Sequence, residues 1–144
     1  MLGKSDKLRL HSLDRIEALE PPDRTFCLPK KFDAEKFFSD YFGIIINDEE
    51  FDVCPVALKV DSWQSKYLRT LPLHHTQVEV ERNEEFSIFE YRLCPSFDFR
   101  QKLHSMGATS EVLAPATLIA KLRKEGIAEP AQQNEEYKFK VYKK

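Results

Sequence analysis

The sequence contains no long apolar run and no apolar region near its start. No stretch approaches the ~20 apolar residues that a membrane-spanning helix requires, so we expect no membrane attachment. The first residues are charged (Lys4, Asp6 and Lys7) and lack the apolar core of a secretory signal peptide. The sequence therefore predicts a protein that stays in the cytoplasm.

The sequence also contains few cysteines and few glycines, and its net charge is small. The cysteines are odd in number and widely scattered (Cys27, Cys54 and Cys94), which fits neither a disulfide framework nor a metal-binding ribbon, and free thiols are expected. The 4 glycines are isolated, so the chain has no glycine-rich phosphate-binding loop. A formal net charge of −2 excludes a globally basic nucleic-acid coat, although it leaves room for a local basic patch.

Patterns typical of catalysis are missing as well. A catalytic site needs a nucleophile beside a base, a pair of carboxylates or a metal cluster. His74 and His75 are adjacent, but in extended chain consecutive side chains point to opposite faces and cannot both bind one ion. No His-Glu-x-x-His or Cys-x-x-Cys spacing accompanies them. We expect that the protein is not an enzyme and holds no metal and no cofactor.

What the sequence does contain is a regular order of amphipathic elements. Alternation of apolar and polar residues predicts strands, and apolar residues three or four positions apart predict helices. The expected strands and helices follow the order β-α-β-β-α-β-α, at about residues 54–61, 62–71, 78–81, 86–93, 97–106, 109–114 and 115–125. This order predicts an α+β fold, the ferredoxin-like split β-α-β sandwich, with two helices on one face of an antiparallel sheet. The other face is left free for a ligand, a partner or the last helix.

The helix expected after residue 61 carries Trp63, Tyr67 and Leu71 on one face. Asp61 or Ser62 is suited to be its N-cap. We expect the three apolar side chains to form the buried face of this helix. On this interpretation, Trp63→Ala removes a large core aromatic and lowers the stability of the fold by about 3–5 kcal/mol.

A short strand and a short helix are expected before the main pattern. Alternating apolar residues predict the strand at about 7–13. Asp33 is suited to cap the helix, Phe32 and Phe37 to form a hydrophobic staple, and Gly43 to stop it.

The chain thus divides into four regions. Residues 1–22 hold the first strand, and residues 23–53 hold the short helix and an acidic linker. Residues 54–127 form the ferredoxin-like domain. Residues 128–144 are a tail in which aromatic and apolar residues alternate with lysines over 137–142, a pattern suited to an added edge strand. Because exposed strand edges pair readily, the first strand and the tail favour a homodimer.

Several short motifs resemble, in order and spacing, the C-terminal part of WYL-domain transcriptional regulators. The motifs that resemble the C-terminal extension of that family (the WCX domain) are Leu71-Pro72-Leu73-His74-His75-Thr76-Gln77, Phe86…Tyr91, Phe97-Asp98-Phe99…Leu103…Ser105-Met106-Gly107 and Glu111-Val112-Leu113-Ala114-Pro115. Upstream, Leu13-Asp14-Arg15-Ile16 resembles the closing strand of the WYL domain itself, a small Sm-like barrel. The resemblance covers about residues 7–125.

The sequence departs from the family's pattern in two ways. It has no Trp-Tyr-Leu triplet, since Gln64 follows Trp63, and His11 stands where the closing strand usually has phenylalanine. It also has no winged-helix DNA-binding domain before residue 7. We therefore expect a C-terminal fragment or a shortened reading frame, with residues 1–22 as a remnant of the barrel, that does not bind a promoter by the family's route.

The resemblance implies a non-enzymatic regulatory role in a bacterial transcription factor. In the family, the barrel binds an effector, proposed to be nucleic acid or a nucleotide-like ligand, and the extension supports dimerisation and allosteric coupling. The resemblance thus implies a homodimer, a nucleotide or oligonucleotide effector, and, in the full regulator, DNA bound through the missing winged-helix domain. Arg15 matches a basic position that faces the effector in the family, and Arg9 falls on the same strand face. Solvated strand arginines are an equally good interpretation of both.

Other polar residues have both a structural and a functional interpretation. His74, His75 and Gln77 either hydrogen-bond within their loop or contact a neighbouring subunit. Three basic residues of the last helix either contact phosphate or complement the helix dipole, and these are Lys121, Arg123 and Lys124.

Two other functions remain open from the sequence. The chain can be a stand-alone protein-interaction domain, which would dimerise tightly and ignore nucleotides. It can also be a single-stranded nucleic-acid binder that uses Arg9, Arg15 and the lysine-rich tail together with aromatic stacking. Salt-dependent binding of short oligonucleotides distinguishes this last function from the others.

Overall fold

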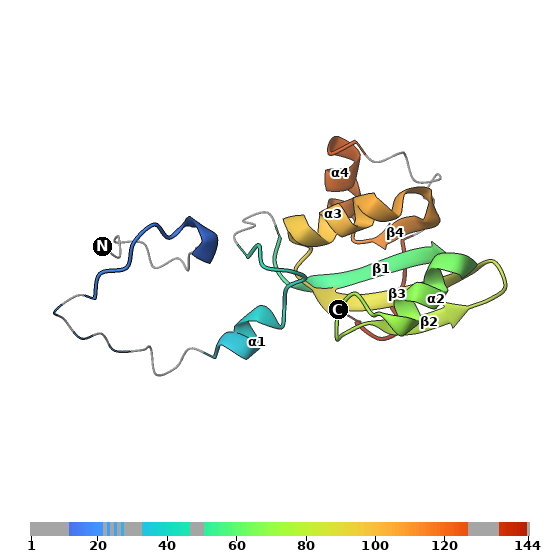
Figure 1. The fold of residues 1–144 in the computed structure, drawn as a ribbon. Helices are drawn as coiled ribbons and strands as arrows, with labels where there is room; N and C mark the ends of the chain where they lie inside the picture. The colour runs from blue at the N-terminus through green and yellow to red at the C-terminus, as the bar shows by residue number, and fades with distance from the viewer. Residues whose placement is uncertain are drawn as a thin grey trace. The chain divides into compact units, whose positions relative to one another are not determined.

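An antiparallel sheet lies at the centre of the longer part of the chain (Figure 1). Its strands are β1 (Cys54–Asp61), β2 (Val78–Arg82), β3 (Phe86–Leu93) and β4 (Ser110–Ala114), in the order β2-β3-β1-β4. The central strands β1 and β3 pair along their whole length, from Cys54 opposite Leu93 to Asp61 opposite Phe86. This strand order, with helices between the strands, confirms the predicted α+β, ferredoxin-like fold.

The structure is a computed structural model, and it describes residues 12–21, 23, 25, 27, 33–46, 51–126 and 136–143. The chain divides into two units, Met1–Lys31 and Phe32–Lys144. In the described part of the first unit the chain forms a 3-10 helix, η1 (Leu13–Arg15). The strand predicted at 7–13 lies mostly outside the described residues. At Leu13 the prediction is wrong, because the Ile16 N–H donates to the Leu13 carbonyl at 3.2 Å and turns the chain.

The helices of the second unit are α1 (Ala34–Phe38), α2 (Ser62–Thr70), α3 (Phe97–Met106) and α4 (Ala116–Lys124), with a 3-10 helix, η2 (Gly107–Thr109), after α3. The predicted cap of α2 is confirmed, because the Asp61 carboxylate accepts a hydrogen bond from the Gln64 N–H at 2.6 Å. The predicted end of α3 is confirmed as well. Gly107 follows it with a φ of +53°, the left-handed region that glycine enters readily. No helix in the described part of the chain is long and apolar enough to cross a membrane.

One face of the sheet, the inner face, forms the hydrophobic core with the helices. Val56 and Leu58 of β1 lie opposite Tyr91 and Phe89 of β3, and residues paired in this way point to the same side. The helical residues that join them in the core are Leu68 of α2, Phe99, Leu103 and Met106 of α3, and Leu118, Ile119 and Leu122 of α4. The last helix therefore packs on the same face of the sheet as α2 and α3.

The opposite, outer face is covered in part by the C-terminal segment, residues 136–143 (Figure 1). Ala57 of β1 and Val78 of β2 both lie opposite Glu90 of β3, and Ala57 and Glu90 are fully buried on this face. The edge strand predicted at 137–142 is wrong, since no described residue of the segment belongs to a strand. Its backbone N–H groups bond to a side-chain carboxylate on the sheet and not to a strand edge.

The buried face of α2 also differs from the prediction. Leu68 is buried, whereas 59% of Trp63, 52% of Tyr67 and 78% of Leu71 are exposed. The prediction that Trp63 is a core residue is therefore wrong. Trp63 and Tyr67 of α2, together with Leu71 directly after it, are exposed apolar side chains that we call the α2 ridge, and the Trp63 and Tyr67 ring centroids lie 4.5 Å apart.

The contacts of Arg69 with the sheet account for the face that α2 turns toward it. Its guanidinium donates to the Glu79 carboxylate at 2.6 Å and to the Ser87 hydroxyl at 2.9 Å. Glu79 lies opposite the core residue Phe89, so this cluster sits on the inner face. A bidentate arginine–carboxylate contact has a defined geometry, and it turns Arg69 and the neighbouring Leu68 toward the sheet.

The short helix before the sheet begins as predicted. The Asp33 carboxylate caps α1 by accepting a backbone N–H at 3.0 Å. Gly43 has a φ of +83°, but α1 ends well before it, so the prediction that Gly43 stops the helix is wrong. Phe32 of the predicted staple and the acidic residues 47–50 lie outside the described residues.

Candidate functional site

The outer face of the sheet holds a buried charge at Glu90, in the middle of β3, which is 0% exposed. Its carboxylate accepts hydrogen bonds from the backbone N–H groups of Lys140, Val141 and Tyr142 at 2.5, 2.7 and 3.1 Å. The Tyr137 hydroxyl donates a further bond at 3.0 Å. Among the described residues no cation forms an ion pair with Glu90, so backbone donors and one hydroxyl stabilise its charge.

These hydrogen bonds set the ionisation of the two groups. Burial raises the pKa of Glu90, but the N–H groups of residues 140–142 and the Tyr137 hydroxyl lower it by more, and the pKa lies below its ordinary value. Burial, together with the hydrogen bond to Glu90, raises the pKa of Tyr137. At neutral pH Glu90 is therefore charged and Tyr137 is neutral, which is the combination that the contacts require.

Two further contacts hold the C-terminal segment on the sheet. The Tyr142 hydroxyl donates to the Thr76 carbonyl at 2.6 Å, in the loop before β2. The Lys140 ammonium lies 2.8 Å from the Glu81 carboxylate of β2. The segment therefore makes polar contacts with β3, β2 and the preceding loop.

A second group of contacts anchors the chain that precedes the sheet. The Asp98 carboxylate, in the first turn of α3, accepts the Ile44 and Ile45 N–H groups at 2.8 and 3.0 Å. Gly43 lies against the same carboxylate, and a Cβ atom at this position would overlap the Asp98 side chain. The absence of a side chain at Gly43 is therefore a condition for the contact with Asp98.

The chain is also attached at the end of β3. Tyr41 forms an isolated parallel bridge with Cys94, whose N–H donates to the Asp40 carbonyl at 2.8 Å. The Cys94 thiol donates to the Phe51 carbonyl at 3.2 Å. Residues 40–45 are thus connected to both α3 and β3.

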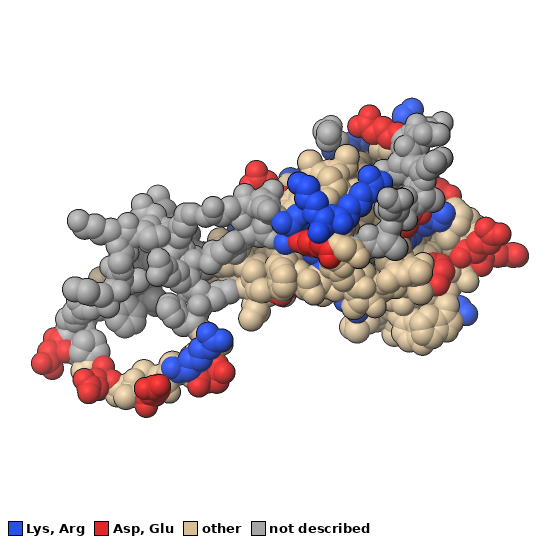
Figure 2. Space-filling model, turned by 90° about the horizontal axis from the view of Figure 1, so that it is seen from above, with Lys and Arg blue, Asp and Glu red and all other residues tan. Residues whose placement is uncertain are grey.

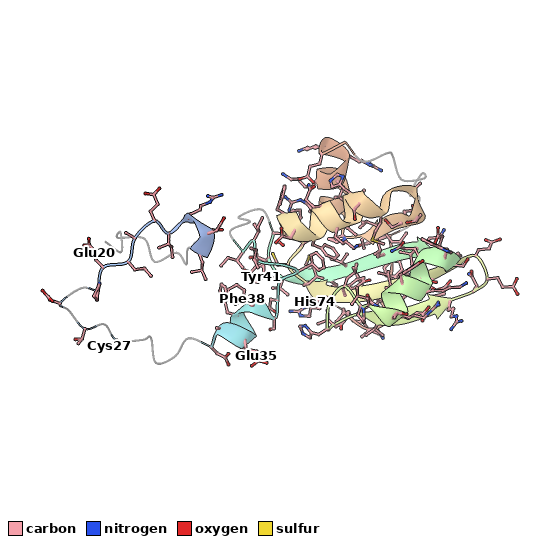
Figure 3. All side chains as sticks on the ribbon, viewed as in Figure 1. Glu20, Cys27, Glu35, Phe38, Tyr41 and His74 are labelled. Carbon is pink, nitrogen blue, oxygen red and sulfur yellow. The ribbon has the colours of Figure 1, made fainter. Side chains whose placement is uncertain are left out.

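His74 lies near the attached residues 40–45, and Figure 3 labels it together with Tyr41. It is buried, its Nδ1 is 2.8 Å from the Thr76 hydroxyl, and its Nε2 is buried without a hydrogen bond of good geometry to the described residues. The centroids of the His74 and His75 rings lie 4.2 Å apart. The chain turns here, so the two side chains do not point to opposite faces as extended chain would require. No group of three or more potential ligands for a metal ion occurs in the described residues.

The surroundings of His74 favour its neutral form. Burial lowers the pKa of His74, and the charge of His75 lowers it further. The Ser39 carbonyl and Asp40 act in the opposite direction but do not offset the effect. Protonation of His74 would therefore place a charge in a site that is built for a neutral ring.

Gln77 makes its hydrogen bonds inside the domain. Its amide nitrogen donates to the Leu68 carbonyl at 2.7 Å, at the end of α2. Its amide oxygen accepts from the Leu73 N–H and from the Tyr91 hydroxyl, both at 3.0 Å. These contacts correspond to the loop interpretation of Gln77, and they also satisfy the buried hydroxyl of Tyr91.

Of the basic residues of α4, Lys121 lies in a cluster of mixed charge with Glu125 and residues of α3. Figure 2 shows lysine and arginine side chains beside acidic ones on the face seen there. Glu125, just after α4, is 3.1 Å from Arg100, 3.2 Å from His104 and 3.7 Å from Lys121. Burial raises the pKa of Glu125, but the His104 hydrogen bond and the two cations lower it by more. The cluster connects α3 to α4. The two other candidate phosphate ligands of the helix are exposed, and they are Arg123 and Lys124.

Of the two arginines expected to face an effector, the structure describes only Arg15. Arg9 lies outside the described residues. Arg15 is exposed at the end of η1. The two-residue period that placed both arginines on one face belongs to strands and does not apply to a 3-10 helix.

Sequence reasoning did not identify Glu90. In an alternating strand with one face in the core, Glu90 falls on the other side and is expected to be solvated. The available signal was the alternation over residues 137–142, which marks the tail as amphipathic. We interpreted that alternation as an edge strand, although the segment uses its backbone to bind a carboxylate.

Comparison with known proteins does not identify a family. No protein-family model matches the chain. No curated protein matches its sequence significantly. The functional proposal therefore depends on the resemblance of the motifs and on the contacts described above.

Proposed function

We propose that this chain is a non-enzymatic regulatory module, the C-terminal region of a bacterial WYL-type transcriptional regulator in the cytoplasm. The order of motifs along residues 71–115 supports the family. In this proposal the module forms a homodimer and couples the domains of the regulator. The effector is a nucleotide or an oligonucleotide, and DNA is bound through an upstream winged-helix domain. The function is then a coupling free energy and not a reaction.

The observation that carries the proposal is the anchoring of the chain before the sheet. Asp98 holds the backbone of Ile44 and Ile45, and Tyr41 is paired with Cys94. A change in the path of the chain before residue 40 would therefore alter contacts at α3 and β3. Coupling requires that two states differ in such contacts, and a flexible connection would not provide them.

The proposal is tested in a regulator that carries the upstream domains. We expect the reading frame before residue 1 to encode a winged helix and a barrel with a Trp-Tyr-Leu triplet. In that longer chain, Asp98→Ala should reduce the effector-induced change in operator affinity by about fivefold or more, as measured by fluorescence anisotropy. Asp52→Ala, at an exposed residue of the same region, is the matched control and should leave the change intact.

Light scattering provides an independent test on the chain itself. We expect a homodimer at micromolar concentration. A monomer at high micromolar concentration, or an operator response that Asp98→Ala leaves unchanged, would contradict the proposal. Salt-dependent binding of short oligonucleotides by a monomer would instead support the function of a single-stranded nucleic-acid binder.

The α2 ridge favours a second candidate, a stand-alone protein-interaction domain. Trp63 and Tyr67 of α2 and Leu71 directly after it are all exposed. Large aromatic residues are enriched at protein interfaces. In this case Trp63→Ala should weaken association with a partner or a second copy by tenfold or more without lowering the stability of the fold. Unchanged association would exclude the ridge as the interface.

A further inference from the structure

The contacts between the C-terminal segment and the outer face of the sheet are those of a bound peptide. Each hydrogen bond to Glu90 ends on a backbone N–H group of residues 140–142 or on the Tyr137 hydroxyl. None of these groups depends on the covalent connection to α4. A free peptide of the same sequence would present the same donors.

We propose that the outer face of the sheet is a peptide-binding site, and that residues 136–143 are its ligand. The segment can then dissociate from the sheet while the binding site and the core stay folded. The proposal does not depend on the regulatory function, because it concerns the recognition of the segment alone.

The chemistry of the site defines the class of peptide that fits. Glu90 takes three consecutive backbone N–H donors, so proline, which has no N–H, is excluded at positions 140–142. Tyr137 adds a hydroxyl donor, and Lys140 adds a cation opposite Glu81. The two side chains that accept hydrogen bonds from the segment, Glu90 and Glu81, are both acidic, so an acidic side chain at position 140 is repelled. The ligand class is therefore a basic, aromatic peptide without proline in its contact region.

The core of the domain supports the separability of the segment. The buried residues of the hydrophobic core come from the sheet and from α2, α3 and α4, and the partly buried side chains packed against them come from the chain before β1, from β1 and from the loop after α2. None of these residues belongs to the segment 136–143. If the segment leaves, water can replace its donors at Glu90. The inner face and its helices would keep their contacts.

The experiment uses the full chain with a weakened segment. In the double variant Tyr137→Ala/Tyr142→Ala, the chain's own segment loses its two hydroxyl contacts. A fluorescent peptide of residues 136–144 is then titrated with this variant and with the unmodified chain, and binding is measured by anisotropy. We expect the peptide to bind the variant at least tenfold more tightly. In the unmodified chain the tethered segment competes at an effective concentration on the order of 1 mM.

Two substitutions show whether binding occurs at Glu90. Adding Glu90→Gln to the double variant should weaken peptide binding at least tenfold. Glu84→Gln, at an exposed residue of the turn between β2 and β3, is the matched control and should change the affinity less than twofold. Circular dichroism confirms that each variant is folded.

A modified peptide gives a test that leaves the protein untouched. N-methylation at Val141 removes one donor to Glu90 and should weaken binding to the double variant at least tenfold. A scrambled peptide of equal charge should bind no better than the methylated one. The proposal is overturned if no peptide binds the folded double variant. It is also overturned if neither Glu90→Gln nor N-methylation weakens binding, or if the scrambled peptide binds as well.

Discussion

Gly43 and Asp98 depend on each other, and the dependence leads to a prediction at the scale of single residues. Gly43→Ala places a Cβ atom against the Asp98 carboxylate and strains a backbone with a φ of +83°. We expect a loss of about 1–3 kcal/mol, because both backbone strain and the hydrogen bonds to Ile44 and Ile45 are affected. Urea denaturation measures the loss.

Gly107→Ala is the matched control for this prediction. Gly107 also has a positive φ, +53°, but nothing lies within 4 Å of an added Cβ atom. The loss of stability in Gly107→Ala therefore measures the backbone strain alone. We expect this loss to be smaller than the loss in Gly43→Ala. Equal losses would show that the contact between Gly43 and Asp98 contributes nothing.

His74 provides a prediction of pH dependence. Its pKa is lowered in the folded protein, so the unfolded chain takes up the proton first as the pH falls. The fold should thus lose stability as the pH decreases below the ordinary histidine pKa of about 6.5, down to the lower pKa of the folded state. In His74→Phe this part of the loss should disappear. Urea midpoints at pH 7 and pH 5 measure it, and an identical decrease in both chains would assign the effect to other groups.

At the scale of elements, the start of α2 and the end of α3 followed from local signals, whereas the buried face of α2 did not. The cap at Asp61 and the stop at Gly107 involve residues close in sequence, and both were predicted. The face of α2 depends on Arg69, whose partner Glu79 belongs to the next strand. Apolar spacing alone pointed to Trp63, since the spacing does not reveal which side the sheet will occupy.

A pair of substitutions on α2 tests the assigned face. Leu68→Ala should lower the free energy of unfolding by about 2–5 kcal/mol, because it leaves a cavity in the core. Trp63→Ala should lower it by less than about 0.5 kcal/mol, because the side chain is 59% exposed. Chemical denaturation of both variants measures the difference. A larger loss of stability for Trp63→Ala than for Leu68→Ala would contradict the assigned face and indicate that Trp63 is the core residue.

At the scale of the whole molecule, the C-terminal segment should detach in acid. The pKa of Glu90 is lowered when the segment is bound, so the charged carboxylate stabilises the bound state above the ordinary glutamate pKa of about 4.3. That stabilisation is lost as the pH falls through the lower pKa of the bound state. Backbone amide NMR signals of residues 140–142 should report a transition with a midpoint below about 4.3, while core signals change little.

Glu90→Gln tests the origin of this transition. An amide in place of the carboxylate cannot titrate, so the signals of residues 140–142 should no longer change in this pH range. A transition of the same size in the variant would assign the detachment to a group other than Glu90.

The sequence by itself determined the order and type of the elements between residues 54 and 124, because alternation, helical spacing and caps are interactions between near neighbours. It therefore predicted the ferredoxin-like sheet and the bounds of β1. Only the tertiary structure decided that Glu90 is buried and which segment binds it. The Glu90 carboxylate and its first backbone donor, Lys140, are 50 residues apart, and backbone N–H groups carry no sequence signature. A contact of that kind becomes visible only when the chain is folded.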